Sequence, residues 1–160
     1  MLIRPCVDED MPRLLEIWMQ ATLHAHDLLP AAMWWPRQEA MRRRLQDGAE
    51  IWVVEPLAFE IERSPVADTS SLNEHSVVGF MAIKDEELLA LYVHPEFQGA
   101  GIGSMLMGLA QQNHRFLYLH VCIRNDEAVR FYQKHGFRPV RELKEAQTGC
   151  DEYLMEYRKP

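Results

Sequence analysis

Apolar residues recur at helical spacing in the first third of the chain. Residues 11–23 predict a helix with one buried stripe. Pro12 fits this helix only in its first turn, where Asp8 or Asp10 can act as a cap. A second helix is expected over residues 37–48. It ends at Gly48, because glycine typically closes a helix.

The period changes near residue 50, where short runs rich in β-branched and aromatic residues predict strands. Residues 2–7 predict an earlier strand, and its Pro5 favours an edge position. The polar, Ser-rich residues 57–76 are expected to form a long hairpin connection. The other expected strands are residues 50–55, 77–84, 87–94, 116–123, 137–140 and 150–157.

Two more helices are predicted after residue 100. Residues 102–113 carry apolar positions on one side, and residues 125–135 begin with Asn125 as a cap and end before Gly136. Strands therefore come in a run before this point and alternate with helices after it, which indicates an α/β fold with a mixed sheet. At 160 residues and without internal repeats, the chain is expected to form one domain, 1–160.

Composition narrows the classes of function. Hydrophobic residues make up 48% and charged residues 26% of the chain, as in ordinary globular proteins, and the net charge of -7 argues against a nucleic-acid partner. The apolar stretch LLALYV is too short to span a membrane, and no targeting segment is visible. Cys6, Cys122 and Cys150 are odd in number without paired spacing, which favours free thiols in a reducing, cytoplasmic compartment and no zinc site.

Gly99, Gly101 and Gly103 open the helix expected at 102–113. A glycine-rich turn at a helix start favours an anion, because backbone amides can point inward and the helix dipole adds positive potential. A tight turn that simply needs glycine is the alternative. Two nucleotide motifs fail: the loop lacks the lysine of a P-loop, and Ser104 stands where the dinucleotide fingerprint needs a glycine.

Two sequence blocks carry a family resemblance. Gln98–Gly103 matches the pattern Q/R-x-x-G-x-G/A, and Asn125–Phe137 matches N-x-x-A-x-x-F-Y-x-x-x-G-F. With both blocks in this order over Leu88–Phe137, the sequence resembles the GNAT superfamily of N-acetyltransferases. The resemblance implies a single domain with a twisted, mostly antiparallel sheet of about seven strands, a splayed parallel pair and about four flanking helices. It also implies acetyl-CoA as co-substrate and no metal.

By the same resemblance, backbone amides of the loop hold the pyrophosphate of coenzyme A. The strand before the loop pairs with the pantetheine arm, and the Val93 amide points at the thioester carbonyl. Asn125 contacts the arm and also caps its helix. The residues implied in coenzyme binding are Leu91, Tyr92, Val93, Gln98, Gly99, Ala100, Gly101, Ile102, Gly103, Ser104, Asn125 and Tyr132.

Tyr132 is the implied acid, because a phenol can protonate or hydrogen-bond the leaving thiolate; packing against the sheet is the alternative. Freeing a protonated amine at neutral pH costs about 4 kcal/mol, which calls for a base or a desolvating pocket. By the same resemblance, Glu87 is the candidate base, because it lies eleven residues before Gln98, where several family members have a glutamate base. Its neighbour Glu86 is expected to face the opposite side of the strand. A merely solvated Glu87, a water chain to it, or a histidine such as His120 stay open as alternatives.

The acceptor is expected to be a primary amine: a protein lysine, an N-terminus or a small molecule. By the same resemblance, His26, Asp27 and Trp34 are expected to border its pocket. A metal site on His24, His26 and Asp27 is not expected. A non-catalytic acyl-CoA sensor on the same fold is the alternative function. Homodimers are common in the family, and neither a membrane nor a nucleic acid is expected as a partner.

Overall fold

The chain forms two compact units in the computed structural model. The first unit consists of Met1–Ala82 and Ala90–Leu106, and the second of Ile83–Leu89 and Met107–Pro160. Each unit is thus made of two separate segments of the chain. The structure describes residues 1–25, 34–57, 77–144 and 150–160.

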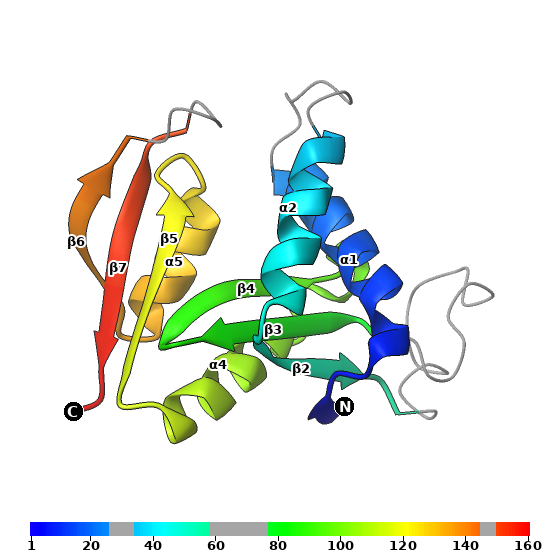
Figure 1. Cartoon of the computed structure of the whole chain (residues 1–160). Helices are drawn as coiled ribbons and strands as arrows, with labels where there is room; N and C mark the ends of the chain where they lie inside the picture. Colours follow the sequence, from blue (N-terminus) through cyan, green and yellow to red (C-terminus); the bar gives the residue numbers. More distant parts are fainter. Residues whose placement is uncertain (26–33, 58–76, 145–149) are drawn as a thin grey trace. The chain divides into compact units, whose positions relative to one another are not determined.

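The helices and strands follow the order that the sequence predicts (Figure 1). In chain order they are β1 (Leu2–Pro5), the 3-10 helix η1 (Asp8–Asp10), α1 (Met11–Ala25), α2 (Trp34–Gln46), β2 (Glu50–Glu55), β3 (Gly79–Lys84), β4 (Glu87–Val93), the 3-10 helix η4 (Pro95–Phe97), α4 (Ile102–Asn113), β5 (Phe116–Cys122), α5 (Asp126–Lys134), β6 (Arg138–Leu143) and β7 (Glu152–Arg158).

Hydrogen bonds join the strands in the order β1-β2-β3-β4-β5-β7-β6. β1 and β2 are antiparallel, as are β5 with β7 and β6 with β7, whereas β4 and β5 are parallel. The expected mixed sheet of seven strands with one parallel pair is therefore confirmed, together with four α-helices among the described residues. β6 ends this order and is bulged between Pro139 and Arg141, which suits an edge strand because proline cannot donate to a neighbour.

The core of the first unit follows the predicted periodicities. On α1, Leu14, Leu15 and Ile17 have at most 1% of their surface exposed. On β3, the neighbours Phe80 and Met81 are both fully buried. Because neighbouring residues of a strand point to opposite faces, β3 is covered on both sides.

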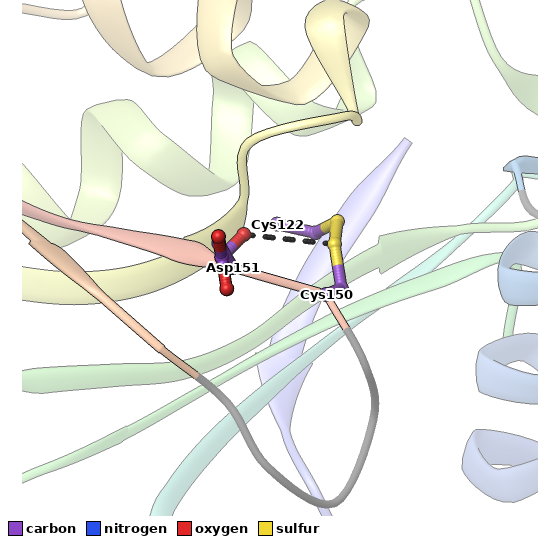
Figure 2. The surroundings of a disulfide bond; sticks show 3 residues. All are labelled: Cys122, Cys150 and Asp151. Atoms are coloured by element: carbon purple, nitrogen blue, oxygen red, sulfur yellow. Dashed lines mark hydrogen bonds between the residues drawn. A yellow bond between two sulfur atoms is a disulfide. The ribbon is translucent and has the colours of Figure 1, made fainter.

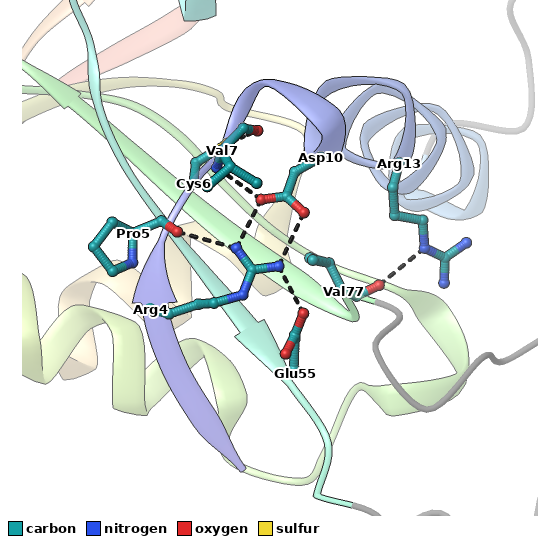
Figure 3. A network of polar contacts seen from close by, with 8 residues as sticks. All are labelled: Arg4, Pro5, Cys6, Val7, Asp10, Arg13, Glu55 and Val77. Carbon is teal, nitrogen blue, oxygen red and sulfur yellow. Dashed lines mark hydrogen bonds and ion pairs between the residues drawn. The ribbon is translucent and has the colours of Figure 1, made fainter.

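A network of polar contacts ties β1 to η1 and β2 within the first unit (Figure 3). The Arg4 guanidinium donates two hydrogen bonds to the Asp10 carboxylate, at 2.8 and 2.9 Å, and one to Glu55 at 2.6 Å. Asp10 also accepts the Val7 backbone amide at 2.9 Å. The hydrogen bonds from Arg4 are the largest cause that lowers the pKa of the Asp10 carboxyl. The network therefore needs Asp10 ionised.

The second helix starts earlier than the sequence predicts. α2 begins at Trp34 instead of residue 37, within the stretch read as a loop because of its prolines. Pro36 lies in the first turn of this helix, where its missing amide has no intrahelical acceptor to lose. Proline there is compatible with a helix start, which the periodicity alone does not show.

In the second unit, β5 has one buried and one partly exposed side. Leu117, Leu119 and Val121 are buried, with 0%, 1% and 7% of their surface exposed. They alternate with less buried residues, as expected for a strand with one face in the core. Phe137 and Tyr157 extend this core, with ring centroids 5.6 Å apart.

The expectation of three free thiols is wrong. Cys122 at the end of β5 and Cys150 before β7 form a disulfide, with Cα atoms 5.8 Å apart (Figure 2). Cys6 is the free cysteine, and burial raises the pKa of its thiol to about 11. The spacing rule fails here because the two partners are 28 residues apart in sequence and meet through strand pairing.

Because folding lowers the pKa of Asp10, its ionised form stabilises the folded state above the usual aspartate range, and this stability is lost as the pH falls. We expect Asp10→Asn to lower the unfolding free energy at pH 7 by about 1–3 kcal/mol, the size of a charged hydrogen bond. The variant should also lose less stability than the wild type below about pH 4. Urea unfolding at pH 7 and pH 3.5 measures both effects, with the exposed Asp8→Asn as control. Equal pH dependence of wild type and Asp10→Asn would contradict the role of Asp10.

Candidate active site

The glycine-rich loop lies in the first unit, between η4 and α4. Gly99 and Gly101 both have φ of +83°, a backbone conformation that side-chain-bearing residues rarely adopt. A Cβ built on either residue would meet no atom within 4 Å. The two glycines are therefore needed for the path of the backbone, and open space surrounds them.

Two side chains brace the entrance to this loop. The Gln98 side-chain amide donates to the Val93 carbonyl at 3.1 Å, which ties the loop to the end of β4. His94 is buried, and its Nδ1 accepts the Glu96 amide at 3.2 Å. Burial, and then the nearby charge of Arg13, lowers the pKa of His94, so its neutral form is favoured as acceptor.

Gly79 is a position of close packing beside this loop that the sequence pattern alone did not single out. A Cβ there would lie 3.1 Å from Ile102 Cγ2, 3.3 Å from the Tyr92 carbonyl oxygen and 3.5 Å from Val93 Cγ2. β3 thus packs tightly against the end of β4 and the first residue of α4. An isolated glycine inside a predicted strand was the available signal, because such glycines often mark a close backbone approach.

The first turn of α4 makes this end of the loop favourable for an anion. Ile102 is buried, with 1% of its surface exposed, and the Met105 amide donates to the Gly101 carbonyl at 3.0 Å. The amides that precede Met105 in the helix have no acceptor within the helix, and the helix dipole places positive potential at this end. The arrangement can hold an anion such as a phosphate.

A polar cluster in the second unit joins β4 to β5. Glu87 lies opposite Tyr118 in the parallel register, and its Oε1 is 3.4 Å from His120 Nδ1. The side chains of Glu87 and His120 are 22% and 36% exposed, so both keep some access to solvent. Burial raises the pKa of Tyr118, and so do the charge of Glu87 and a side-chain hydrogen bond with it. One carboxylate is thus shared by a phenol and an imidazole.

A strained turn positions Glu87. Asp85 and Glu86 connect β3 to β4 with φ of +49° and +71°, values that are uncommon for residues other than glycine. The Glu86 carbonyl accepts the Tyr118 amide at 3.0 Å, which fixes the turn against β5. Glu86 is therefore a turn residue that precedes β4. The expectation that it lies on the strand and faces the side opposite to Glu87 is wrong.

Tyr118 was also missed, although the sequence holds a partial signal for it. Alternation along β5 places Tyr118 and His120 on the same side of the strand, opposite the buried leucines. The contact with Glu87 depends on the parallel register of β4 and β5, which is not visible in either segment alone.

Asn125 and Tyr132 both belong to α5 or its start. The Asn125 side-chain oxygen accepts the Ala128 amide at 3.2 Å, which confirms the predicted cap. Its NH₂ group is a donor that the cap does not use. Tyr132 is half-buried, and its ring packs edge-on against Phe131 and Phe137, with centroids 5.5 and 5.7 Å away.

The residues expected around the acceptor are not placed by the structure. His26 and Asp27 lie outside the described residues, and of Trp34 only the backbone, the first residue of α2, is described. Within the described part of the chain, no group of three or more His, Cys, Asp or Glu side chains could hold a metal ion. Among those same residues, none of the helices has the length and apolar character needed to cross a bilayer.

Comparison with known proteins decides the family. YjaB of Salmonella typhimurium, a peptidyl-lysine N-acetyltransferase, is 31% identical to this chain over 136 residues, covering 85% of this chain and 82% of YjaB. The family model of the acetyltransferase (GNAT) domain matches residues 66–139. The chain belongs to the GNAT family. Because its curated relatives are N-acetyltransferases, this GNAT protein is an acetyltransferase rather than a non-catalytic sensor.

Other relatives of this GNAT acetyltransferase extend the match over nearly the whole chain. YiaC of Escherichia coli, also a peptidyl-lysine N-acetyltransferase, is 27% identical over 157 residues, which is 98% of this chain and 96% of YiaC. The solution structure of apo YjaB from Escherichia coli matches with a TM-score of 0.74 at 25% identity, covering 99% of this chain and 98% of that one. The fold implied by the resemblance is thereby confirmed.

We expect Gly101→Ala to lower the unfolding free energy by about 1–2 kcal/mol, because an added Cβ disfavours the left-handed backbone. Gly108 in the middle of α4 is a matched control, since it has ordinary φ and open space around its Cα. Gly108→Ala should raise the unfolding free energy by about 0.5–1 kcal/mol through higher helix propensity. Chemical denaturation of both variants measures the difference, and a Gly101→Ala protein as stable as the wild type would refute the left-handed turn.

Proposed function

We propose that this GNAT protein transfers an acetyl group from acetyl-CoA to a primary amine, directly within a ternary complex. The observation that carries the proposal is the loop at the start of α4, whose two left-handed glycines leave open space at the N-terminal end of a helix, where the helix dipole favours an anion. Family membership supports it, because the curated relatives are N-acetyltransferases. The matches over nearly the whole chain support a single functional domain, 1–160.

The chain's own residues divide the binding of the coenzyme among them. Backbone amides from Gly99 to Ser104 bind the pyrophosphate, and Gln98 keeps the loop tied to β4. Leu91, Tyr92 and Val93 present the backbone of β4 to the pantetheine arm, and the Val93 amide stabilises the oxyanion. The free NH₂ group of Asn125 donates to the same arm while its oxygen caps α5.

The polar cluster of the second unit provides the base. A lysine-like amine is protonated at neutral pH, and freeing its lone pair costs about 4 kcal/mol. Glu87 receives this proton, directly or through water, and His120 and Tyr118 hold the carboxylate in place.

The new C–N bond forms at the thioester carbonyl as the C–S bond breaks, so the sulfur leaves as a thiolate. Tyr132 donates to this sulfur and stabilises its charge as it develops. The aromatic rings of Phe131 and Phe137 hold Tyr132 in one orientation on α5.

The acceptor class follows from charge and from the relatives. A cationic amine suits a chain with a net charge of -7 and a base formed by a carboxylate. YiaC and YjaB are peptidyl-lysine N-acetyltransferases, which supports a lysine side chain in a protein as the acceptor. His26, Asp27 and Trp34 remain the proposed border of the acceptor pocket.

Thiol release from acetyl-CoA, measured across a panel of lysine peptides, N-terminal peptides and small amines, tests the proposal. We expect release with at least one primary amine, and a fall of about 10²-fold or more in kcat for Tyr132→Phe with little change in the KM for acetyl-CoA. Tyr153→Phe on β7 is the matched control and should keep full activity.

Coenzyme A at a hundredfold its Kd should stabilise the protein by about 2.7 kcal/mol, whereas NAD and ATP should not. Failure of coenzyme A to shift the melt would overturn the proposal.

Glu87 and Glu86 form a second matched pair. We expect Glu87→Gln to lower kcat/KM by about 10²-fold or more, because the amide cannot accept the amine proton. Glu86→Gln should change kcat/KM little, because Glu86 lies in the exposed turn and contributes its backbone carbonyl to Tyr118. Steady-state rates with the best amine measure both. Equal losses in the two variants would indicate a general effect of negative charge and no base at Glu87.

A further inference from the structure

The disulfide of the second unit lies where the pairing of β5 with β7 ends. The two strands pair without interruption from Phe116–Arg158 to Cys122–Glu152, so the sheet itself does not need a covalent link. One residue further, the Ile123 amide donates to the Asp151 carbonyl at 2.9 Å. The Cys122–Cys150 bond therefore lies at the end of a strand pair that is already complete without it (Figure 2).

The same cysteine is linked to the proposed site by short steps along the backbone. The Cys122 carbonyl accepts the Asn125 amide at 3.0 Å, and the Asn125 carbonyl accepts the Val129 amide at 3.0 Å. Asn125 also caps α5, the helix that carries Tyr132. Alternation on β5 places Cys122 on the same side as His120. The disulfide is thus attached to the turn that leads from β5 into α5, and this turn and helix carry Asn125 and Tyr132.

Both oxidation states of the pair fit the local structure. Neither cysteine is buried, so a dissolved thiol can approach the bond. The Cys150 Sγ lies 3.6 Å from the Asp151 carbonyl oxygen. In the disulfide this sulfur carries no proton, whereas in the reduced protein a thiol at the same position can donate to that oxygen. After reduction, the Cys150 thiol therefore has a hydrogen-bond acceptor within reach.

We propose that Cys122–Cys150 is a thiol-exchange site through which small-molecule thiols and their disulfides set the affinity for acyl-CoA. A thiolate attacks one sulfur of the bond, and the other cysteine leaves as a thiolate that takes up a proton. A second thiol then attacks the mixed disulfide and releases the oxidised small molecule. In sum, two thiols lose two electrons to the protein, which gains two cysteine thiols.

The exchange acts on binding through the β5–α5 turn. With the bond intact, Asn125 and α5 are held in the binding geometry. After reduction, the turn populates this geometry for only part of the time, and a ligand that needs it binds more weakly in proportion. The affinity readout rests on the proposed function, whereas the exchange chemistry does not.

A redox titration of the full chain tests the site. The protein is equilibrated in buffers with defined ratios of reduced to oxidised dithiothreitol, and its thiols are counted by alkylation and mass spectrometry. We expect one alkylated cysteine, Cys6, at the oxidising end and three at the reducing end, reversibly. Three alkylated cysteines at every ratio would overturn the proposal.

Coenzyme A titrations by calorimetry and acetyl-CoA kinetics are then run on both forms. The reduced form should show a Kd and a KM about three- to tenfold higher, with kcat within about twofold and an unchanged circular dichroism spectrum. If the disulfide is merely structural, its reduction should instead lower the melting temperature and kcat together. Equal affinity in the two forms would also overturn the proposal.

Matched variants complete the experiment. Cys122→Ser/Cys150→Ser should have the affinity of the reduced wild type at every buffer ratio, whereas Cys6→Ser should respond as the wild type does. If the double variant does not fold, the reversible titration of the wild type alone decides. Binding of coenzyme A without any acetyl transfer would refute the proposed function and leave the exchange site to be judged by calorimetry.

Discussion

The path of the backbone from β4 into α4 is the constraint on which the proposed chemistry depends. This path needs two left-handed residues, Gly99 and Gly101, within three positions. It also needs Gly79, because β3 approaches the end of β4 and the start of α4 too closely for a side chain. The result is a helix start with open space beside Gly99 and Gly101, and the N-terminus of a helix can attract a phosphate without any basic residue. Such a helix start would let a chain with a net charge of -7 bind the polyanionic coenzyme that we propose.

In the second unit, β5 is the strand that positions the polar side chains. Its buried side supplies Leu117 and Leu119 to the core, while its other side presents polar groups. Parallel pairing with β4 brings Glu87 to Tyr118 and His120, and antiparallel pairing with β7 brings Cys122 to Cys150. One strand therefore contacts the proposed base through β4 on one side and carries one half of the disulfide beside β7 on the other.

The sequence predicted the elements whose signals are local. The strand over residues 50–55 and the helix over 102–113 were correct to the residue, because their periodicities are complete within each segment. The cap at Asn125 was also correct, since side-chain capping depends on neighbours three residues apart. The start of α2 was predicted too late because proline is ambiguous at a helix start.

Features that depend on strand pairing could not be predicted. The Cys122–Cys150 bond, the Tyr118–Glu87 contact and the close packing at Gly79 all join residues far apart in the chain. Their partners are set by register and by packing, which periodicity does not determine. The glycine loop was found through its spacing, but the reason for each glycine came from φ angles and from the space around each Cα.

The most direct test of the central claim is a titration of the ¹⁵N-labelled protein with coenzyme A, followed through backbone amide signals. If the helix start binds the pyrophosphate, the amides from Gly99 to Ser104 should shift strongly with coenzyme A and with 3′-phosphoadenosine 5′-diphosphate, which keeps the pyrophosphate. They should hardly shift at all with pantetheine alone. Coenzyme A that leaves these six amides unchanged while it shifts others would contradict the account.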